Sequence, residues 1–380
     1  MSRRHWAHLV TAAVVLAAAA LAAAAPAAAG TAASGTGAAA GPAAAAAAYL
    51  QARAAAITAP DPAAVLAPYV VAGSALARTE AKVAAGAALL GASTTRTLDA
   101  AACSVDVVDR RPSSDGVAAS VGAHAVTSLT WRSPSGKADV EASGIDHMLT
   151  LARSGSVWVV TADAYVDDLK AACLEAAGAS RASVRAAARV VERAAKPMAL
   201  PAAAPRLGPA TRRYSDVIEY DRPSAQDYAD TYALAYNPTF AHFSGVDCAN
   251  FASQCARAGD MPQASGSTSS GWWYDKQGTS SPGDDQYSLS WINVTRQMSY
   301  WNTRKSDWET SAGVLSRGDF IYYDWSGDGV WDHVAVVAGT NSSGQKVIDA
   351  HTTDHYHVYW KLGTSSTKYK FARVRAQWVV

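Results

Sequence analysis

Residues 244–255 have the sequence Ser-Gly-Val-Asp-Cys-Ala-Asn-Phe-Ala-Ser-Gln-Cys, which places a cysteine where an irregular loop turns into a helix. Cys248, Phe251, Ala252 and Cys255 follow i, i+3, i+4, i+7 spacing and share one helix face. Cys248 begins this apolar stripe at the helix N-terminus, where first-turn N–H groups and the helix dipole favour a thiolate. We interpret Cys248 as a nucleophile. From this stretch alone, Cys248 could equally well be a small buried apolar residue with no catalytic role.

The residue before the cysteine has two opposite effects. As an N-cap, Asp247 would fix the turn into the helix. As a neighbouring anion, it would disfavour a second negative charge on the thiol. A protonated imidazole beside Cys248 would offset this repulsion, so the downstream histidines decide the case.

Two histidines flank a predicted β-hairpin. We expect strands at 319–323, 333–338 and 346–351, so His333 opens one strand and His351 closes its antiparallel neighbour. Both then lie at the same edge of the sheet, and they are adjacent if both side chains point to the same face.

These residues supply the parts of covalent acyl transfer. Cys248 would attack a carbonyl, His333 would hold and return its proton, and His351 would orient His333. Asp349 and Asp354 compete with His351 for the third role. The Cys248 backbone N–H would contribute to an oxyanion hole.

The same residues resemble a known family. Gly318-Asp319 before an aromatic strand, His333-Val334 and Asp247-Cys248 are similar to the NlpC/P60 group of papain-like cysteine hydrolases. The putative amidase domain of that superfamily is closer still, on the landmarks Tyr220-Asp221-Arg222, Tyr236-Asn237-Pro238, residues 247–254, residues 290–294 and Asp332-His333-Val334. The resemblance covers roughly residues 214–361. It implies a helix packed on an antiparallel sheet, and cleavage of amide bonds, usually in peptidoglycan.

The first half of the chain has a different amino-acid composition. It is rich in alanine, whereas nine of the twelve tryptophans lie after residue 270. Helices are predicted at 43–57 and 75–90, then strands at 104–109, 117–131, 139–151 and 157–160, and a helix within 167–195. This order indicates an α+β fold and resembles the nuclear-transport-factor-2-like group in topology.

The N-terminus has the features of an export signal. Arg3 and Arg4 precede an apolar stretch at 9–25, and Ala27-Ala28-Ala29 supplies the small residues that signal peptidase requires. We divide the chain into a signal peptide at 1–29, a disordered linker at 30–42, a small α+β domain at 43–195, a linker at 196–212 and an NlpC/P60-like domain at 213–380. A secreted or cell-wall-associated protein without stable membrane insertion is expected.

Export to an oxidising compartment raises the question of disulfides among the four cysteines. Seven residues along a helix separate Cys248 from Cys255 by roughly 10 Å, which exceeds the reach of about 7 Å between disulfide-bonded Cα atoms. Cys103 and Cys173 are the plausible remaining pair, and cross-pairing between the halves stays open.

Other residues are candidates for binding. We expect Asp247, Tyr236, Trp272, Trp273 and Trp331 to contact substrate. The acidic loop at 324–332 has partial calcium-loop spacing, but it lacks the closing acidic residue and is predicted to be a polar turn.

No cofactor or metal is expected. The histidines at 351, 355 and 357 do not have the ligand spacing of a zinc site. The net charge of +1 gives no reason to expect a nucleic-acid partner.

These observations predict a secreted cysteine hydrolase that cleaves amide or peptide bonds, with peptidoglycan or a related peptide as substrate. Two alternatives remain: a non-catalytic wall-binding protein on the same scaffold, and an enzyme that transfers an acyl group to an amine.

Overall fold

The computed structural model describes residues 41–92, 95–113, 116–194, 217–278, 281–302 and 304–379. The predicted signal peptide, nearly all of the 30–42 linker and the 196–212 linker lie outside these residues. Residues 39–380 form one compact unit. Within the described ranges, none of the helices has the length and apolarity needed to cross a membrane.

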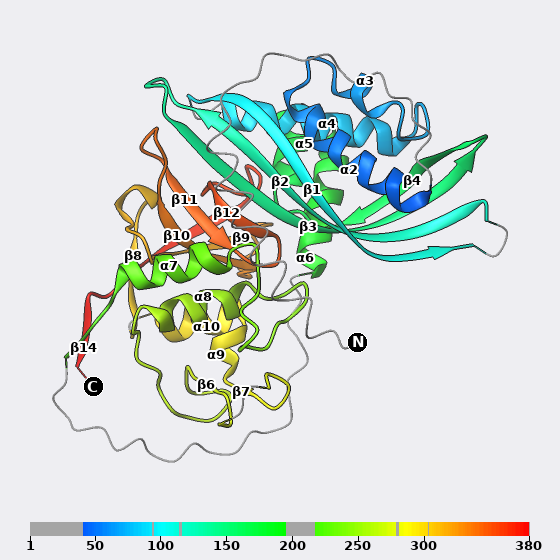
Figure 1. The fold of residues 1–380 in the computed structure, drawn as a ribbon. Coiled ribbons are helices and arrows are strands. Elements are labelled where there is room, and N and C mark those ends of the chain that lie inside the picture. The colour runs from blue at the N-terminus through cyan, green and yellow to red at the C-terminus, as the bar shows by residue number, and fades with distance from the viewer. Residues whose placement is uncertain are drawn as a thin grey trace. The chain divides into compact units, whose positions relative to one another are not determined.

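Helices come first and strands follow in the N-terminal half (Figure 1). The predicted helices and strands are confirmed, with strands longer than expected. Asp61 caps the second helix by accepting hydrogen bonds from the Ala63 and Ala64 N–H groups. The elements are α2 (Pro42–Thr58), α3 (Pro62–Leu66), α4 (Ala75–Ala92), β1 (Thr97–Pro112), β2 (Ala118–Arg132), β3 (Ala138–Ser154) and β4 (Val157–Tyr165).

The helix predicted within 167–195 is two helices, α5 (Lys170–Ala176) and α6 (Arg181–Ala194). Gly178 between them has φ +66°, a left-handed conformation that ends α5. Alanine-rich composition favours helix throughout this segment, so only the glycine marks the break.

The C-terminal half places helices before a second group of strands. The predicted cysteine helix and the strands on either side of His333 are all present. The elements are β5 (Val217–Glu219), α7 (Arg222–Tyr232), α8 (Cys248–Ala258), β6 (Tyr274–Asp275), β7 (Gln286–Tyr287), α9 (Leu289–Ile292), α10 (Val294–Trp301), β8 (Ser306–Glu309), a 3₁₀ turn η2 (Ala312–Val314), β9 (Phe320–Asp324), β10 (His333–Thr340), β11 (Lys346–Ala350), β12 (Asp354–Tyr359), β13 (Lys368–Val374) and β14 (Gln377–Val379).

Ten antiparallel strands from both halves form one sheet, in the order β1-β2-β3-β12-β11-β10-β9-β13-β8 with β4 beside β3. The joint between the halves is the β3–β12 pair, in which His355 lies opposite Ser143. The protein is therefore α+β with a large antiparallel sheet.

Both faces of strands β9–β11 are buried. One face carries Val334 and Val336 and packs against α8 in the core that also holds Phe251. The other carries Ala335 and Val337 and contacts Val191 of α6. The N-terminal half thus contributes to covering the face opposite α8.

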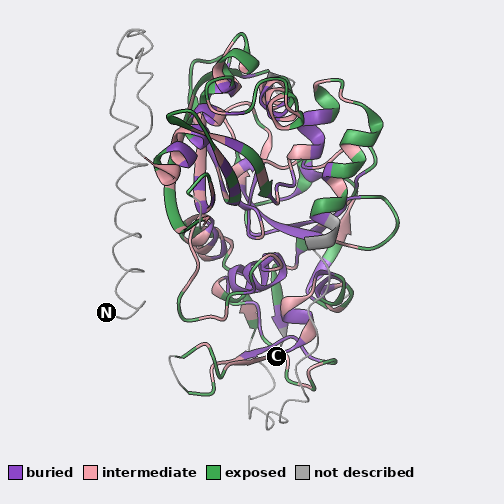
Figure 2. Ribbon diagram, turned by 90° about the vertical axis from the view of Figure 1, so that its right-hand side faces the viewer, coloured by how far each residue is buried: buried purple, intermediate pink, exposed green. Residues whose placement is uncertain are grey.

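Helix α8 is buried on every side, from Cys248 to Ala256 (Figure 2). Its polar residues are paired: Asn250 Oδ1 accepts the Trp291 indole N–H at 3.0 Å, and Ser253 Oγ donates to the Trp291 carbonyl at 2.8 Å. The apolar stripe in the sequence therefore marks only one of the packed faces of α8. The opposite face is also buried, and its polar side chains are hydrogen-bonded.

Candidate active site

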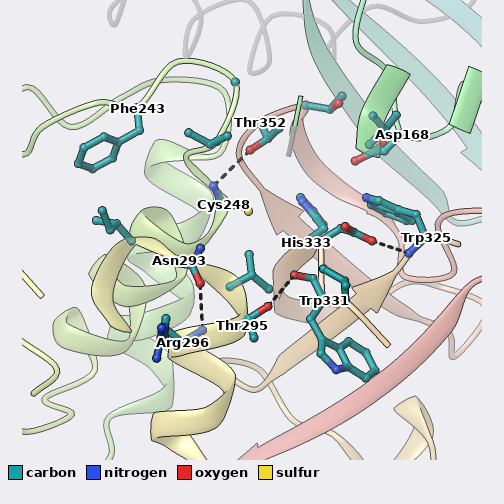
Figure 3. Close-up of a pocket in the computed structure, with 18 of the residues that line it drawn as sticks. Asp168, Phe243, Cys248, Asn293, Thr295, Arg296, Trp325, Trp331, His333 and Thr352 are labelled. Carbon is teal, nitrogen blue, oxygen red and sulfur yellow. Dashed lines mark hydrogen bonds between the residues drawn. The ribbon is translucent and has the colours of Figure 1, made fainter. Parts of the chain in front are cut away.

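Cys248 and His333 line one cavity of about 440 Å³. In Figure 3 the Cys248 sulfur points into this cavity on the side where the His333 ring lies. The walls come from the loop before α8, from α9 and α10, from the loop before β10, from the β11–β12 turn and from the N-terminal half. The lining residues are Asp168, Val191, Phe243, Gly245, Val246, Cys248, Leu289, Ile292, Asn293, Val294, Thr295, Arg296, Trp325, Val330, Trp331, Asp332, His333, Thr352 and Thr353.

The Cys248 thiol is protonated at neutral pH. Burial raises its pKa to about 11. Hydrogen bonds from the Val334 backbone and the Thr352 side chain act in the opposite direction, and the Asp247 charge raises the pKa further. The helix N-terminus does not overcome burial, because Cys248 is only 4% exposed.

His333 is a neutral base with a free nitrogen. Burial lowers its pKa to about 4; Asp168 opposes this shift and His355 adds to it. The ring lies against Trp325 and Tyr323, with both centroid separations at 5.5 Å. His333 Nε2 is buried and has no hydrogen-bond partner among the described residues. This nitrogen is available to take a proton.

His351 does not orient His333, contrary to the sequence-based expectation. Val336 lies opposite Asp349, and the same register carried to the strand end puts His351 opposite Val334. Side chains alternate along a strand, so His351 lies on the α8 face and His333 on the other. The His351 ring accordingly stacks on Phe251 at 3.9 Å.

The partner of His351 is Asp247. His351 Nδ1 lies 2.7 Å from Asp247 Oδ2, and Nε2 lies 2.7 Å from the Tyr232 carbonyl. Two acceptors on one ring favour imidazolium, and although burial opposes it, these bonds raise the pKa of His351. Asp247 Oδ1 also accepts the Phe243 N–H and the Asn250 amide. The Asp247 charge is therefore compensated by the His351 imidazole.

Neither acidic alternative for the third role is bonded to His333. Asp349 Oδ1 accepts the His357 backbone N–H at 2.7 Å, and Asp354 Oδ1 accepts the Tyr236 hydroxyl at 2.9 Å.

The Cys248 backbone N–H, our expected oxyanion-hole donor, donates to Thr352 Oγ1 at 3.3 Å. Thr352 itself has φ +92°, a strained conformation for a β-branched residue. Such strain persists where the surrounding structure holds it, and it concentrates at functional sites. The Thr352 hydroxyl thus lies beside both the nitrogen and the sulfur of Cys248.

Asp168 is a wall residue that sequence reasoning missed. It comes from the segment after β4, it is 4% exposed, and its Oδ1 lies 2.7 Å from His355 Nε2. Burial works against its ionisation, but the charge and hydrogen bond of His355 lower the pKa of Asp168. A carboxylate from the N-terminal half therefore faces the cavity that holds His333. No sequence signal marks it, since it depends on strand pairing between distant segments.

Of the predicted substrate-binding residues, only Trp331 lines the cavity. Trp272 and Trp273 are core residues, at 0% and 1% exposed; Trp272 stacks on Trp291 at 4.8 Å and donates its indole N–H to Ser253. Tyr236 packs on His351 at 4.5 Å, outside the cavity lining. Asp247 is buried beneath the turn.

The cysteines form no disulfide, and the acidic loop at 324–332 is a polar turn. All four thiols are free, so the suggested Cys103–Cys173 pair is not formed; these residues lie in separate hydrophobic clusters. Asp324 accepts backbone N–H groups from Gly327, Asp328 and Gly329, which is a polar turn. Asp332 accepts the Trp325 N–H and so ties down the loop that leads to His333.

Parts of the chain are similar to known proteins. The Bacillus subtilis proteins YhbB and YjcM, both uncharacterized, are 30% and 28% identical over 42% and 40% of this chain. The matches span 52% and 35% of the relatives' own lengths. A solved structure, the intermembrane space region of chloroplast protein ARC6, aligns with 32% of the chain and 90% of its own length, at 17% identity and a TM-score of 0.24.

A family described as "Putative amidase domain" matches residues 219–374. This range contains Cys248, His333 and every cavity-lining residue except Asp168 and Val191. The C-terminal half of the chain thus matches a putative amidase domain, which suggests amide hydrolysis by a hydrolase.

Proposed function

We propose that the protein is an exported cysteine amidase or peptidase that cleaves amide bonds of peptidoglycan or a related peptide. One observation carries this proposal: a thiol at a helix N-terminus and an imidazole with an unpartnered Nε2 line the same cavity. The signal-like N-terminus supports export, and the resemblance to the NlpC/P60 group supports the substrate class. Packing of α8 on antiparallel strands supports a papain-like arrangement.

The reaction starts from a neutral pair. Cys248 Sγ attacks the scissile carbonyl carbon while its proton passes to His333 Nε2, and the carbonyl oxygen becomes an oxyanion. His333 then protonates the leaving amine as the C–N bond breaks, which leaves a thioester. Water adds to the thioester carbonyl and gives one proton to His333. His333 returns this proton to the sulfur as the C–S bond breaks, and the carboxylic acid product releases its remaining proton to solvent.

The buried charges around the pair have separate tasks. Asp168 stabilises the imidazolium that forms on His333 during attack, because it is anionic and favours the protonated ring. Asp247 and His351 neutralise each other beneath the turn and hold the start of α8. Thr352 supplies a hydroxyl beside Cys248, and this hydroxyl can donate to the oxyanion.

The test is hydrolysis of purified peptidoglycan fragments, followed by mass spectrometry. The intact chain should release products, and Cys248→Ala should abolish release while circular dichroism and the melting temperature stay close to those of the parent. Cys103→Ala, which removes a thiol far along the chain on β1, is the matched control and should retain activity. Equal turnover by Cys248→Ala would refute the proposal.

The same assay separates the alternatives. Binding to cell walls without products, unchanged in Cys248→Ala, would indicate a wall-binding protein. Products joined to an added amine such as glycinamide would indicate acyl transfer.

A further inference from the structure

We propose a binding site for a divalent first-row transition-metal cation formed by Asp230 of α7, Asp349 of β11 and His357 of β12. One donor atom from each of these side chains lies within 4.8 Å of the other two. Carboxylate oxygens and an imidazole nitrogen are a donor set that suits Zn²⁺ and its neighbours. This inference does not depend on the proposed amidase activity.

A buried acceptor without a donor points to a ligand. Asp349 is 0% exposed, and its Oδ1 accepts the His357 backbone N–H. Its other oxygen, Oδ2, is buried and has no hydrogen-bond partner among the described residues. Leaving a buried carboxylate oxygen unsatisfied costs free energy, so a proton or a cation is required there.

The neighbouring carboxylate strengthens this requirement. One carboxylate oxygen of Asp230 lies within 4.8 Å of one of Asp349, and Asp349 is fully buried. Two neighbouring carboxylates favour a cation or a shared proton between them, and the His357 ring is hydrogen-bonded to Asp230 alone among the two. A metal ion would satisfy both and would compete with a shared proton.

The remaining geometry suits a metal. His357 Nε2 is hydrogen-bonded to Asp230 Oδ1 at 2.9 Å. A metal ion in place of the bridging proton would hold the two atoms about 3.4 Å apart in the tetrahedral geometry usual for zinc, so only a small movement is needed. Both side chains are 29% exposed, and His357 also lines a second cavity of about 490 Å³. A cation can therefore enter from solvent and keep water in its open positions.

Zn²⁺ binding to the full chain tests the site by titration calorimetry. The Cys248→Ala background removes the pocket thiol, a competing zinc ligand, and makes the result independent of catalysis. We expect one equivalent to bind. Asp349→Asn and His357→Gln, each made in that background, should weaken binding by at least about tenfold.

His124→Gln in the same background is the matched control. His124 also pairs with an aspartate, Asp146, at 2.8 Å, and it is 30% exposed, yet its removal should leave affinity unchanged.

Two readouts guard against misfolded variants. Zn²⁺ should raise the Tm of the Cys248→Ala protein and not that of the His357→Gln variant, whose side chain is partly exposed. Co²⁺ should give visible absorption bands that His357→Gln weakens. Failure of Zn²⁺ to bind at micromolar concentration would overturn the proposal. Affinity in both ligand variants equal to that of the Cys248→Ala protein would overturn it as well.

Discussion

At the scale of single residues, burial holds the proposed nucleophile Cys248 and the proposed base His333 in their uncharged forms. The pKa of Cys248 is raised to about 11 and that of His333 is lowered to about 4. Between these values the thiol keeps its proton and the imidazole is neutral. The site therefore differs from a preformed thiolate–imidazolium pair, and transfer of the proton must accompany attack on substrate.

Alkylation measures this state. Between pH 6 and 9 the reaction of Cys248 with iodoacetamide should be slow and should rise about tenfold per pH unit, because only the thiolate reacts. The rate should level off near pH 11. Mass spectrometry of the peptide that contains Cys248 measures the extent of alkylation. A plateau already at pH 7 would show that the free enzyme holds a thiolate.

The carboxylate from the N-terminal half should affect catalysis through His333. Asp168→Asn removes a charge that favours imidazolium, so we expect kcat to fall by about tenfold, which corresponds to one pKa unit. The acid limb of the pH–rate profile should move to lower pH, since the ring becomes harder to protonate. His355, whose charge also acts on His333, loses its Asp168 partner in this variant.

Asp167→Asn is the matched control. Asp167 is adjacent and buried, and burial raises its pKa, so it contributes less negative charge. A fall in kcat without movement of the acid limb in Asp168→Asn would mean that Asp168 has only a structural role.

At the scale of elements, the cysteine helix depends on the buried pair at its start. Asp247→Ala leaves the His351 cation unpaired and removes the acceptor of the Phe243 N–H. We expect unfolding free energy to drop by about 3–5 kcal/mol, measured by urea denaturation. His351→Ala should add little to Asp247→Ala, because the two residues act as a pair.

Asp221→Ala is a useful comparison, since this aspartate caps α7 at an exposed position by accepting the Ser224 N–H. Asp221→Ala should lower the free energy of unfolding clearly less than Asp247→Ala does. Equal decreases in the two variants would show that Asp247 acts only as a cap.

Sequence patterns predicted most elements but not the face of each strand. Spacing placed His333 and His351 at one edge of a hairpin, as observed. A one-residue difference in register decides the face, and nothing in residues 333–351 fixes it. Similarly, the stripe beginning at Cys248 predicted helix α8, but its hydrogen bonds to Trp291 need a segment some forty residues later.

At the scale of the whole molecule, the joined sheet explains what local patterns could not predict. The predicted α+β class is confirmed by the ten-stranded antiparallel sheet. The pairing of Ser143 with His355 brings Asp168 to the cavity, and no local sequence pattern indicates this pairing. The residues of the proposed metal site were not grouped from the sequence either, because Asp230 lies on a helix far from His357 along the chain.

The joined sheet should unfold in one step. Tryptophan fluorescence reports mainly on residues after 270, whereas far-UV circular dichroism reports on both halves. We expect their urea transitions to coincide, because separation would break the β3–β12 pair and the buried Asp168–His355 contact. Two resolved transitions would show that the halves unfold independently.

The divided edge of β3 also bears on synthesis and export. Residues 147–154 of β3 pair with the nearby β4, but Ala142, Ser143 and Gly144 pair with a strand that begins at Asp354. During elongation these three residues remain an open sheet edge until more than two hundred further residues have been made, and such edges invite pairing with other chains. Closure over this sequence distance is entropically slow. Refolding should therefore show a late, rate-limiting phase in which the cavity is assembled, and chains truncated before β12 should aggregate.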